Sequence, residues 1–532
     1  MFAQTVCNHR ALCFMLVIVL FFSAGLFVSS QDSPPKTPSA AIHAFENIMQ
    51  QPHYKNAHWG ILVVDCATGQ PLFEVNADRL FLPASTTKLY STAAFLDTFG
   101  ADFRYRTPVV HRGEIKDGEL NGDLVLVASG DPTMGGRTDD HDKIQFSNID
   151  HTYANGSLDS EPTKANPLAG LQSLAKQVAA KGIKSIKGQI IIDDRLFDSA
   201  EGTGSGPKHL TPIMINDNVI DIMIKPDKEV GQAASVETRP RTAAYLVDAQ
   251  IETVEAGKPL QVRSSSPMPG RLVVRGQIPK GHKPVLRVHE VDDPATFARA
   301  LFIDELKRAG VRLQASHFER NSTASLPSRE QVVQWPPLAE FTSPPASEEI
   351  KLVLKVSHNL HASTLPLMLA VKHNERTLEK GLRREGQALR KLGVDIDSIA
   401  LGSGAGGART DLTSPRVTVQ LLLAMRKHAT FDVYKAAMPI LGVDGTLYNV
   451  LEPDSPAKGQ FHAKTGTYYL ENELTGRYIL TSKALAGYGT TQSGRQVAFA
   501  LFVNYTHLMA PSGSLREGKT LAKFCEAIYK HF

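Results

Sequence analysis

One short stretch, Pro83-Ala-Ser-Thr-Thr-Lys88, constrains the fold of this chain more than any other. Proline suits the first turn of a helix, and apolar residues recur after it at helical spacing as far as Gly100. Ser85 and Lys88 then lie one turn apart on the same face of a buried central helix. An amine held beside a hydroxyl can remove its proton, so the pair predicts a serine nucleophile with its base. Taken alone, the same pattern also fits a helix cap followed by a solvated lysine.

The size and charge of the chain restrict its class. Its 532 residues are enough for several domains, and an apolar content of 42% is sufficient for packed cores. The formal net charge of +4 is spread along the chain without long basic runs, which argues against a nucleic-acid partner.

Residues 1–30 form a separate segment. His9 and Arg10 precede an apolar run that ends at Val28, and two serines follow it. This order predicts a secretory signal peptide that is cut after Ser30, and therefore export of the rest of the chain. An uncleaved N-terminal anchor is the alternative, because the apolar run nearly reaches the length of a membrane span.

Two cysteines follow that segment, Cys66 at the end of an apolar run and Cys525 in the last helical stretch. They can form a disulfide in an oxidising compartment, or they can stay as two buried free thiols. The sequence leaves this choice open because it gives no distance between them.

The early and middle parts of the chain read as strands and polar loops. A flexible leader at 31–40 precedes a hairpin between Gly60 and Asn76, and β-like runs dominate from about residue 103 to 290. His141 and His151 lie in a polar stretch at 135–167 that shows no known metal-ligand spacing. That stretch is predicted to be a solvated loop rather than a metal site.

The late part alternates between helical and strand patterns. A glycine-rich loop at 402–407 lacks the preceding strand and following helix of a dinucleotide site, so a nucleotide is not expected there. The predicted elements are a helix at 294–310, an irregular linker at 320–348, a strand at 351–356, helices at 359–372 and 376–391, strands near 460–470, 484–488 and 495–505, and a helix at 513–530.

Two further patterns bear on Ser85. Ser357-His-Asn359 stands at the start of a predicted helix, and Lys464-Thr-Gly-Thr467 lies on a predicted strand. Each by itself is an ordinary cap or turn. The order Ser-x-x-Lys, Ser-x-Asn, Lys-Thr-Gly, however, is the signature of the penicillin-binding and β-lactamase serine acyltransferases.

Beyond these motifs, the chain resembles the D-alanyl-D-alanine carboxypeptidase/endopeptidase family, the class C low-molecular-mass penicillin-binding proteins of peptidase family S13. The long separation of Ser85 from Ser357 agrees with the large insertion that this family carries. The stretches that carry the resemblance are 83–88, 130–132, 216–218, 402–404, 442–447, 487–488 and 494–500.

The resemblance implies an α/β (α+β) fold. A serine β-lactamase/transpeptidase-like domain, with a five-stranded antiparallel sheet between helices, is expected from residues 31–101 and 291–532. Residues 102–290 are expected to form one or two smaller, mostly β accessory domains. The same resemblance places the exported protein in the periplasm, with peptidoglycan stem peptides as substrate.

The family's catalytic roles fall on five residues of this sequence, Ser85, Lys88, Ser357, Asn359 and Lys464. By resemblance, Ser85 attacks the penultimate D-alanine carbonyl and Lys88 accepts its proton. Ser357 relays a proton to the leaving amine, Asn359 holds Lys88 and the substrate amide, and Lys464 attracts the terminal carboxylate. The backbone N–H groups of Ser85 and Thr467 would form the oxyanion hole.

Substrate-binding roles are carried over in the same way. Thr465, Gly466 and Thr467 would lie beside the terminal carboxylate. Asp193 and Arg409 would contact the free end of the stem-peptide side chain, since a carboxylate and a guanidinium together suit a group with an amine and a carboxylate. An ordinary surface ion pair or turn residue is the competing explanation for each of these two.

One stretch departs from the family pattern. Sixteen residues, 468–483, separate Lys464-Thr-Gly-Thr467 from the next strand, where the family has a tight hairpin. The added residues are expected to lengthen the hairpin, which leaves substrate preference and the role of Tyr468 open.

The resulting hypothesis is a serine D-Ala-D-Ala carboxypeptidase and D,D-endopeptidase that needs no metal or cofactor and is acylated by β-lactams. The alternatives are a serine β-lactamase or esterase of the same fold, and a non-catalytic cell-wall-binding scaffold. The sequence leaves open the balance of the two peptidase activities, the oligomeric state and any loose association with the membrane.

Overall fold

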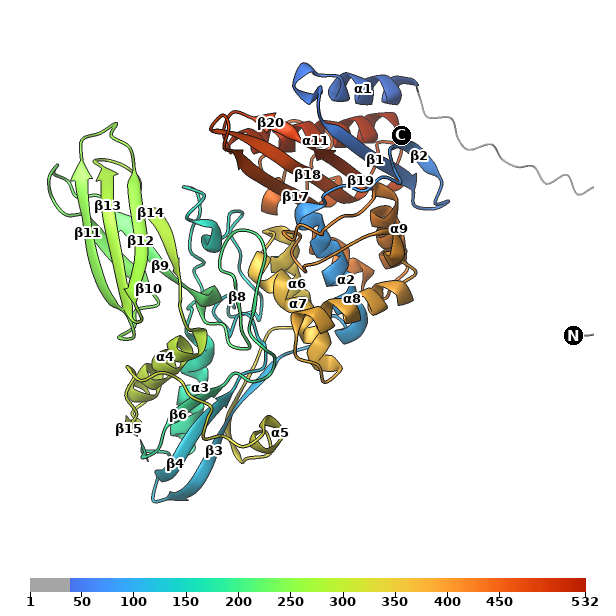
Figure 1. Cartoon of the computed structure of the whole chain (residues 1–532). Helices are drawn as coiled ribbons and strands as arrows, with labels where there is room; N and C mark the ends of the chain where they lie inside the picture. Colours follow the sequence, from blue (N-terminus) through green and yellow to red (C-terminus); the bar gives the residue numbers. More distant parts are fainter. Residues whose placement is uncertain (1–38) are drawn as a thin grey trace, which may run out of the picture. The chain divides into compact units, whose positions relative to one another are not determined.

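A computed structural model describes residues 39–532 (Figure 1). The predicted signal peptide and nearly all of the predicted leader lie outside the described residues. The last two leader residues, Ser39 and Ala40, begin a helix instead. Within residues 39–532, no helix combines the length and the apolarity that a membrane span requires.

The catalytic body, residues 39–101 and 346–532, is built on an antiparallel sheet in the order β17-β18-β19-β1-β2. Strand β20 pairs with the first part of β18, outside that order. The predicted five-stranded antiparallel sheet is therefore present. The strands are β1 (His58–Asp65), β2 (Pro71–Val75), β17 (Phe461–Asn472), β18 (Arg477–Thr490), β19 (Gln496–Asn504) and β20 (Thr506–Leu508). Because β17 pairs only with β18 along this path, it lies at one edge of the sheet.

Both faces of this sheet are buried, because its central strands carry apolar residues at successive positions. Along β19, Phe499 and Leu501 point to one core, while Ala500 and Phe502 point to the other. The helices of this body are α1 (Ser39–Met49), η1 (Pro52–Tyr54), η2 (Ala84–Thr87), α2 (Lys88–Phe99), α6 (Ala346–Lys355), α7 (Asn359–Lys372), α8 (Leu378–Lys391), η5 (Ile396–Ser398), α9 (Pro415–Arg426), α10 (Phe431–Ala436), η6 (Gly445–Leu447) and α11 (Gly513–His531).

The helices divide between the two faces. Helices α1 and α11 contribute apolar residues to the same core as Phe499, and Phe45 of α1 lies against Phe524 of α11. Helices α2, α6, α7 and α9 enclose the core on the other side, where the side chains of α2 are almost all buried. The Ser85 helix is thus the central helix that its sequence predicts.

The region inserted after α2 is mostly β, as predicted. Its strands are β3 (Arg106–Lys116), β4 (Glu119–Val127), β5 (Ser185–Ile186), β6 (Ile190–Asp193), β7 (Ala200–Glu201), β8 (His209–Leu210), β9 (Val219–Lys225), β10 (Ser235–Arg239), β11 (Leu246–Val254), β12 (Gln261–Met268), β13 (Arg271–Pro279), β14 (Val285–Glu290), β15 (Arg312–Leu313) and β16 (Pro337–Thr342). Its helices are η3 (His151–Tyr153), α3 (Ala169–Ala180), η4 (Asn216–Asn218), α4 (Pro294–Arg308) and α5 (Arg329–Val332).

The boundary expected at residue 291 is too early. Strand β16 pairs antiparallel with β3, β15 pairs with β5, and α4 contributes apolar residues to the same core as α3. Residues 294–342 therefore pack with the insertion, and the chain returns to the catalytic body at α6. The predicted linker at 320–348 is correspondingly wrong in part, since it contains α5 and β16.

Two other local predictions are wrong for identifiable reasons. The expected strand at 351–356 is the end of α6, because Ile350, Val353 and Leu354 pack into the body core while acidic residues occupy the first helical turn. The stretch at 135–167 is not simply a solvated loop, because His151 is buried among charged groups.

The two cysteines are free, buried thiols. Burial raises the pKa of the Cys66 thiol to about 11. The question that the sequence left open is therefore answered in favour of unpaired cysteines.

Candidate active site

The nucleophile candidate stands on a tight turn at the start of the central helix. Ser85 lies in the 3₁₀ turn η2, which runs directly into α2, and Lys88 is the first residue of α2. The Lys88 Nζ atom lies 2.8 Å from Ser85 Oγ. Ser85 is half-buried and Lys88 is fully buried, so the hydroxyl is open to a ligand while the amine is shielded from water.

Close backbone packing holds this turn from two sides. A Cβ atom at Gly466 of β17 would lie 2.5 Å from the carbonyl oxygen of Pro83. Gly406, whose φ is +92°, would bring a Cβ to 1.9 Å from the carbonyl oxygen of Ala84. Only glycine fits at either position, so the sheet edge and the 402–407 loop both press directly on the nucleophile turn.

The Lys88 amine has three oxygen partners. It lies 2.7 Å from Asn359 Oδ1 and 2.9 Å from the Ala405 carbonyl oxygen, besides Ser85 Oγ. Burial lowers the pKa of Lys88 to about 7, against an opposing influence of Asp411. A neutral amine keeps two N–H donors for Asn359 and Ala405 and turns its lone pair toward the serine hydroxyl. The site can therefore hold the lysine in the form that accepts a proton.

The Ser-x-Asn residues lie where α6 ends and α7 begins. Ser357 has a φ of +63°, which is uncommon for a residue other than glycine. Asn359 presents Oδ1 to Lys88, and its Nδ2 donates to the Ser205 carbonyl oxygen at 2.9 Å. The amide side chain is thus oriented by the insertion on one side and by the central helix on the other.

Lys464 approaches from the edge strand β17. Its Nζ donates to Ser357 Oγ at 2.9 Å and to the Thr465 carbonyl oxygen at 2.6 Å. Burial, followed by the nearby Lys88 and Lys483, holds the pKa of Lys464 well below its usual value. Among residues 39–532, no carboxylate forms an ion pair with Lys88 or Lys464. An incoming carboxylate would therefore be the first counter-charge for Lys464, and it would favour the ammonium form.

The threonines of the Lys-Thr-Gly-Thr segment are also fixed by neighbours. Thr465 Oγ1 lies 2.8 Å from Thr446 Oγ1, and Thr467 Oγ1 accepts a hydrogen bond from Lys483 Nζ at 2.9 Å. Because Thr467 accepts from Lys483, its own O–H remains available to donate to a ligand. Burial lowers the pKa of Lys483 to about 8.

The structure brings five of the predicted residues into two hydrogen-bonded groups, Ser85 with Lys88 and Asn359, and Ser357 with Lys464, which meet at the 357–359 turn. The hydrogen bonds described above include neither of the two side-chain candidates. Asp193 is fully buried and accepts from Arg195 at 2.8 and 3.0 Å. Arg409 is exposed, and no ion pair of its side chain is found in residues 39–532. The substrate roles of these two residues stay predictions.

Three contributors were missed by the sequence analysis. Ala405 acts through its backbone carbonyl, which no side-chain motif reveals. Lys483 belongs to the extra stretch 468–483 and is visible only through strand pairing, since β18 sets it opposite Thr467. Tyr153 lies in the polar stretch that was predicted to be solvated, yet its hydroxyl contacts both sides of the Ser357-His-Asn359 turn.

The extra residues at 468–483 lengthen the β17–β18 hairpin, as expected. Pairing continues from Tyr468 to Asn472, opposite Arg477 to Ser482. Several apolar side chains on this extension are exposed, with Leu474 at 95%.

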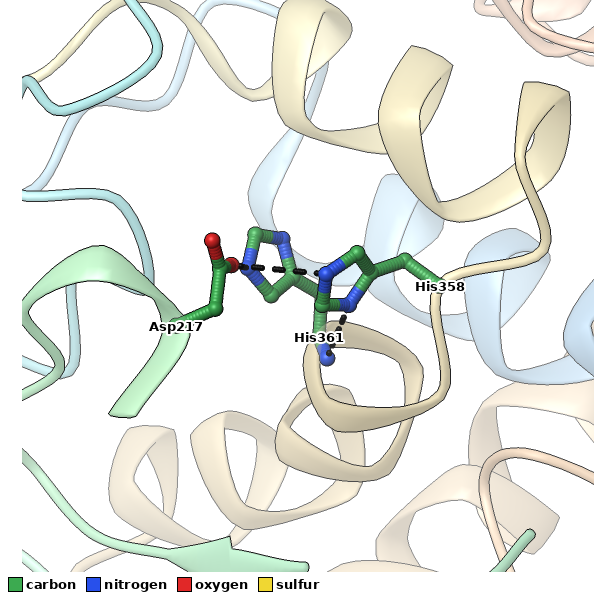
Figure 2. Close-up of side chains that lie close together, drawn as sticks. All are labelled: Asp217, His358 and His361. Carbon is green, nitrogen blue, oxygen red and sulfur yellow. Dashed lines mark hydrogen bonds and ion pairs between the residues drawn. The ribbon is translucent and has the colours of Figure 1, made fainter. Parts of the chain in front are cut away.

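One set of side chains has the composition of a metal site, Asp217, His358 and His361 (Figure 2). Asp217 Oδ1 lies 2.7 Å from His361 Nε2 and 3.4 Å from His358 Nε2. Metal-bound histidines usually donate their second ring N–H to an acceptor. Here His358 Nδ1 instead accepts from the His361 backbone N–H at 3.4 Å, and His361 Nδ1 has no partner. The donor set therefore does not fit a metal.

A guanidinium already supplies the cation in this cluster. Arg137 donates to Asp217 Oδ2 at 2.9 Å and binds Asp150 with two bonds of 2.7 and 3.0 Å. Burial alone would raise the pKa of Asp217, but Arg137 and the surrounding histidines hold it well below its usual value. Burial opposes protonation of His151, yet Asp221 and Asp150 raise its pKa to about 10. The cluster is thus a buried ion network in which the carboxylates pair with Arg137 and His151.

The comparisons with known proteins cover nearly the whole described chain. The sequence model of the D-Ala-D-Ala carboxypeptidase 3 (S13) family matches residues 41–520. A D-alanyl-D-alanine carboxypeptidase from Actinomadura sp. (strain R39) is 27% identical over 457 residues, which are 81% of this chain and 76% of that protein. The D-alanyl-D-alanine carboxypeptidase DacB from Haemophilus influenzae is 24% identical over 486 residues, which are 88% and 90% of the two chains.

A solved structure has the same fold. The crystal structure of penicillin binding protein 4 (dacB) from Haemophilus influenzae superposes with a TM-score of 0.66 at 21% identity. The superposition covers 91% of this chain and 99% of that one, so it includes both the catalytic body and the insertion.

Proposed function

The chain belongs to the D-Ala-D-Ala carboxypeptidase 3 (S13) family and is therefore a serine-type carboxypeptidase, and we propose that Ser85 is its nucleophile. The observation that carries this proposal is the contact of Ser85 Oγ with a buried lysine amine whose pKa is lowered to about 7. A hydroxyl becomes nucleophilic when an adjacent neutral base can take its proton. Lys88 is such a base, so Ser85 does not require a histidine for this step.

In the acylation step, Ser85 Oγ attacks the carbonyl carbon of the penultimate D-alanine while its proton passes to Lys88 Nζ. The tetrahedral oxyanion would be held by the backbone N–H groups of Ser85 and Thr467. The C–N bond then breaks, and the leaving D-alanine amine takes the proton that Lys88 had accepted, relayed through the Ser357 hydroxyl, which leaves Lys88 neutral again. Ser357 suits this relay because its Oγ connects to Lys464 at 2.9 Å and its backbone lies next to Asn359.

In the deacylation step, water attacks the ester and Ser85 regains its proton. Lys88 is again the base, because it stays within 2.8 Å of the ester oxygen's position. Asn359 and Ala405 keep the amine oriented in both steps by accepting its remaining N–H groups. A second amine in place of water would give transpeptidation.

Lys464 is proposed to bind the terminal carboxylate. Its pKa is held low by burial and by the neighbouring Lys88 and Lys483, so its ammonium group loses a proton easily when no substrate is bound. A bound carboxylate would favour the ammonium and reverse that effect. Substrate binding and proton uptake at Lys464 are therefore linked, and the O–H of Thr467 adds a neutral donor beside the cation.

The remaining assignments extend the family's activity to its setting. The substrate is the D-Ala-D-Ala end of a peptidoglycan stem peptide, and β-lactams acylate Ser85 because they mimic that end. Cleavage of cross-links (the D,D-endopeptidase reaction) and a periplasmic location after export by residues 1–30 complete the proposal. No metal or cofactor is needed for these steps.

Labelled penicillin tests the central assignment. Wild-type protein is expected to form a covalent adduct of long lifetime at Ser85, and Ser85→Ala is expected to form none. Ser493→Ala is the matched control. Ser493 lies in the turn after β18, and its hydroxyl donates to the Phe532 carbonyl oxygen. Release of D-alanine from purified muropeptides, followed by chromatography, measures the carboxypeptidase reaction directly.

The outcomes separate the hypotheses. Rapid turnover of the adduct would identify a β-lactamase, and an absent adduct in the wild type would identify a non-catalytic scaffold. Adduct formation that persists in Ser85→Ala would place the nucleophile elsewhere. Cleavage of cross-linked muropeptide dimers distinguishes endopeptidase from pure carboxypeptidase activity.

A further inference from the structure

The turn that carries Ser357 and Asn359 depends on one hydroxyl from the insertion. Tyr153 Oη donates to the Ser357 carbonyl oxygen at 2.8 Å and accepts from the Asn359 backbone N–H at 3.0 Å. The Tyr153 hydroxyl therefore bridges the backbone groups on the two sides of His358. We propose that Tyr153 is a positioning residue for acylation, which holds Ser357 and Asn359 where they meet Lys464 and Lys88; this inference rests on the proposed function.

The turn needs an external partner for two reasons. Ser357 adopts a left-handed backbone conformation, φ +63°, which is disfavoured for serine unless neighbouring groups impose it. The Asn359 N–H belongs to the first turn of α7, where backbone donors have no partner inside the helix. The N-cap residue His358 accepts from the His361 N–H and not from Asn359. Tyr153 supplies the missing acceptor.

The consequences reach both catalytic amines. Ser357 Oγ accepts from Lys464, and Asn359 Oδ1 accepts from Lys88. A shift of this turn would lengthen both contacts at once, because the two side chains leave the same three-residue segment. Small displacements of catalytic groups have large effects on rate, so one distant hydroxyl can control the acylation step.

Tyr153 is itself fixed by the arginine-centred network. It ends the 3₁₀ turn η3, whose N-cap Asp150 accepts from the Thr152 N–H and binds Arg137 with two hydrogen bonds. His151, in the same turn, pairs with Asp221 at 2.6 Å. The two residues that precede Thr152 are thus anchored in the insertion, and Tyr153 projects from this anchor to the active site.

The phenol is suited to this role and not to that of a base. Burial and the nearby Asp150 carboxylate raise the pKa of Tyr153, so its O–H stays protonated and keeps donating to Ser357. Its ring centroid lies 6.5 Å from that of His358, between the ion network and the turn. Removing only the hydroxyl would preserve this ring packing.

The test is Tyr153→Phe, with Tyr488→Phe as the matched control. Tyr488 is a buried tyrosine whose hydroxyl donates to the Leu422 carbonyl oxygen in α9, away from the Ser357 turn. Acylation by labelled penicillin is measured over a range of concentrations, which separates the first-order acylation rate from the noncovalent dissociation constant. Tyr153→Phe is expected to slow acylation by roughly ten- to a hundredfold with an unchanged dissociation constant. Tyr488→Phe is expected to acylate at the wild-type rate.

A double-mutant cycle with Asn359→Ala distinguishes positioning from a general loss of structure. If Tyr153 acts through the turn, its substitution costs clearly less in the Asn359→Ala background than in the wild type. Fully multiplicative effects, or a Tyr153→Phe rate within about twofold of the wild type, would overturn the inference. If the phenylalanine variant does not fold, 3,5-difluorotyrosine at position 153 keeps the hydroxyl but weakens it as an acceptor, and a smaller loss in the same direction is expected.

Failure of the two proposals can be told apart. Wild-type protein that is not acylated at all overturns the proposed function and this inference with it. Wild-type protein that is acylated at Ser85, together with an unchanged rate in Tyr153→Phe, overturns the positioning role alone.

Discussion

Two groups of buried charges meet at the first turn of α7, and they are built in opposite ways. In the proposed active site, the amines of Lys88 and Lys464 are buried beside hydroxyl, amide and carbonyl oxygens, and no carboxylate among residues 39–532 is paired with either. In the network behind it, Arg137 and His151 are buried against three aspartates. His358 belongs to the network, while Ser357 and Asn359 on either side of it belong to the pocket.

The difference shows in how the two groups hold their protons. Burial without a counter-charge disfavours the ammonium and lowers the pKa of Lys88 to about 7, so this lysine can exchange a proton near neutral pH. Burial with counter-charges has the reverse result: it raises the pKa of His151 to about 10 and lowers that of Asp217. Unpaired burial makes a reactive group, whereas paired burial makes a permanent charge that supports structure.

The largest expected effect comes from removing the unpaired base. Lys88→Met keeps the length of the side chain but cannot accept the serine proton, so acylation by labelled penicillin is expected to fall by about 10³- to 10⁴-fold. Lys391→Met is the control, because that lysine is exposed and pairs with Asp97 far from the pocket's hydrogen bonds. A Lys88→Met rate close to that of the control would show that the lysine is not the base.

Breaking the paired network is expected to affect stability more than chemistry. Asp217→Asn leaves Arg137 and His151 without a shared counter-charge, which is expected to cost about 3–5 kcal/mol in the free energy of unfolding. Urea denaturation measures this loss. Asp248→Asn, which loosens a part-exposed pair with Arg271 and Arg275, is expected to cost far less, because solvent screens that pair. Equal losses in the two variants would contradict the structural role of the network.

The two kinds of burial also predict opposite pH dependence of stability. Lys88, with its folded pKa lowered to about 7 from 10.5, binds fewer protons when folded, so its contribution to stability rises between pH 7 and 10. His151, with its pKa raised to about 10 from 6.5, contributes stability that is full below pH 6.5 and is lost as pH rises through 10. The two slopes oppose each other in the wild type.

Single substitutions unmask each slope. Between pH 7 and 10, the pH slope of the unfolding free energy is expected to be more negative than the wild-type slope in Lys88→Met and more positive in His151→Gln, each by up to about 1.4 kcal/mol per pH unit. Urea titrations at several pH values provide the measurement. A change of slope with the same sign in both variants would show that the environments of Lys88 and His151 do not differ as described.

The smallest effect is expected at the edge of the pocket. Arg409 is exposed and follows the 402–407 loop, which packs against the nucleophile turn. Arg409→Ala is expected to lower kcat/KM about tenfold for stem peptides whose side chain ends in an amine and a carboxylate. Penicillin acylation should not change, because penicillin lacks that side chain. Arg383→Ala, on the exposed face of α8, is the control. Equal activity of Arg409→Ala and the wild type on these stem peptides would remove Arg409 from the substrate site.

Much of this pocket could be predicted because its chemistry is written in short local patterns. Ser85 and Lys88 are one helical turn apart, so their contact follows from helix geometry alone. The same local regularity made α7, α8 and the closing strands predictable. The pairing of the Asp193 carboxylate with Arg195 could not be predicted, because no motif indicates it, and the substrate role of Asp193 stays a prediction.

By itself, the sequence predicted the Ser85–Lys88 contact, because that contact depends on local helical spacing, and its resemblance to the S13 family implied the five-stranded sheet and the large β-rich insertion. Only the tertiary structure decided where the insertion ends, how Ala405, Lys483 and Tyr153 complete the pocket, and which buried charges are paired. Those features depend on contacts between residues far apart in the chain. A side chain's proton affinity depends on such neighbours, so it cannot be assigned before the fold is known.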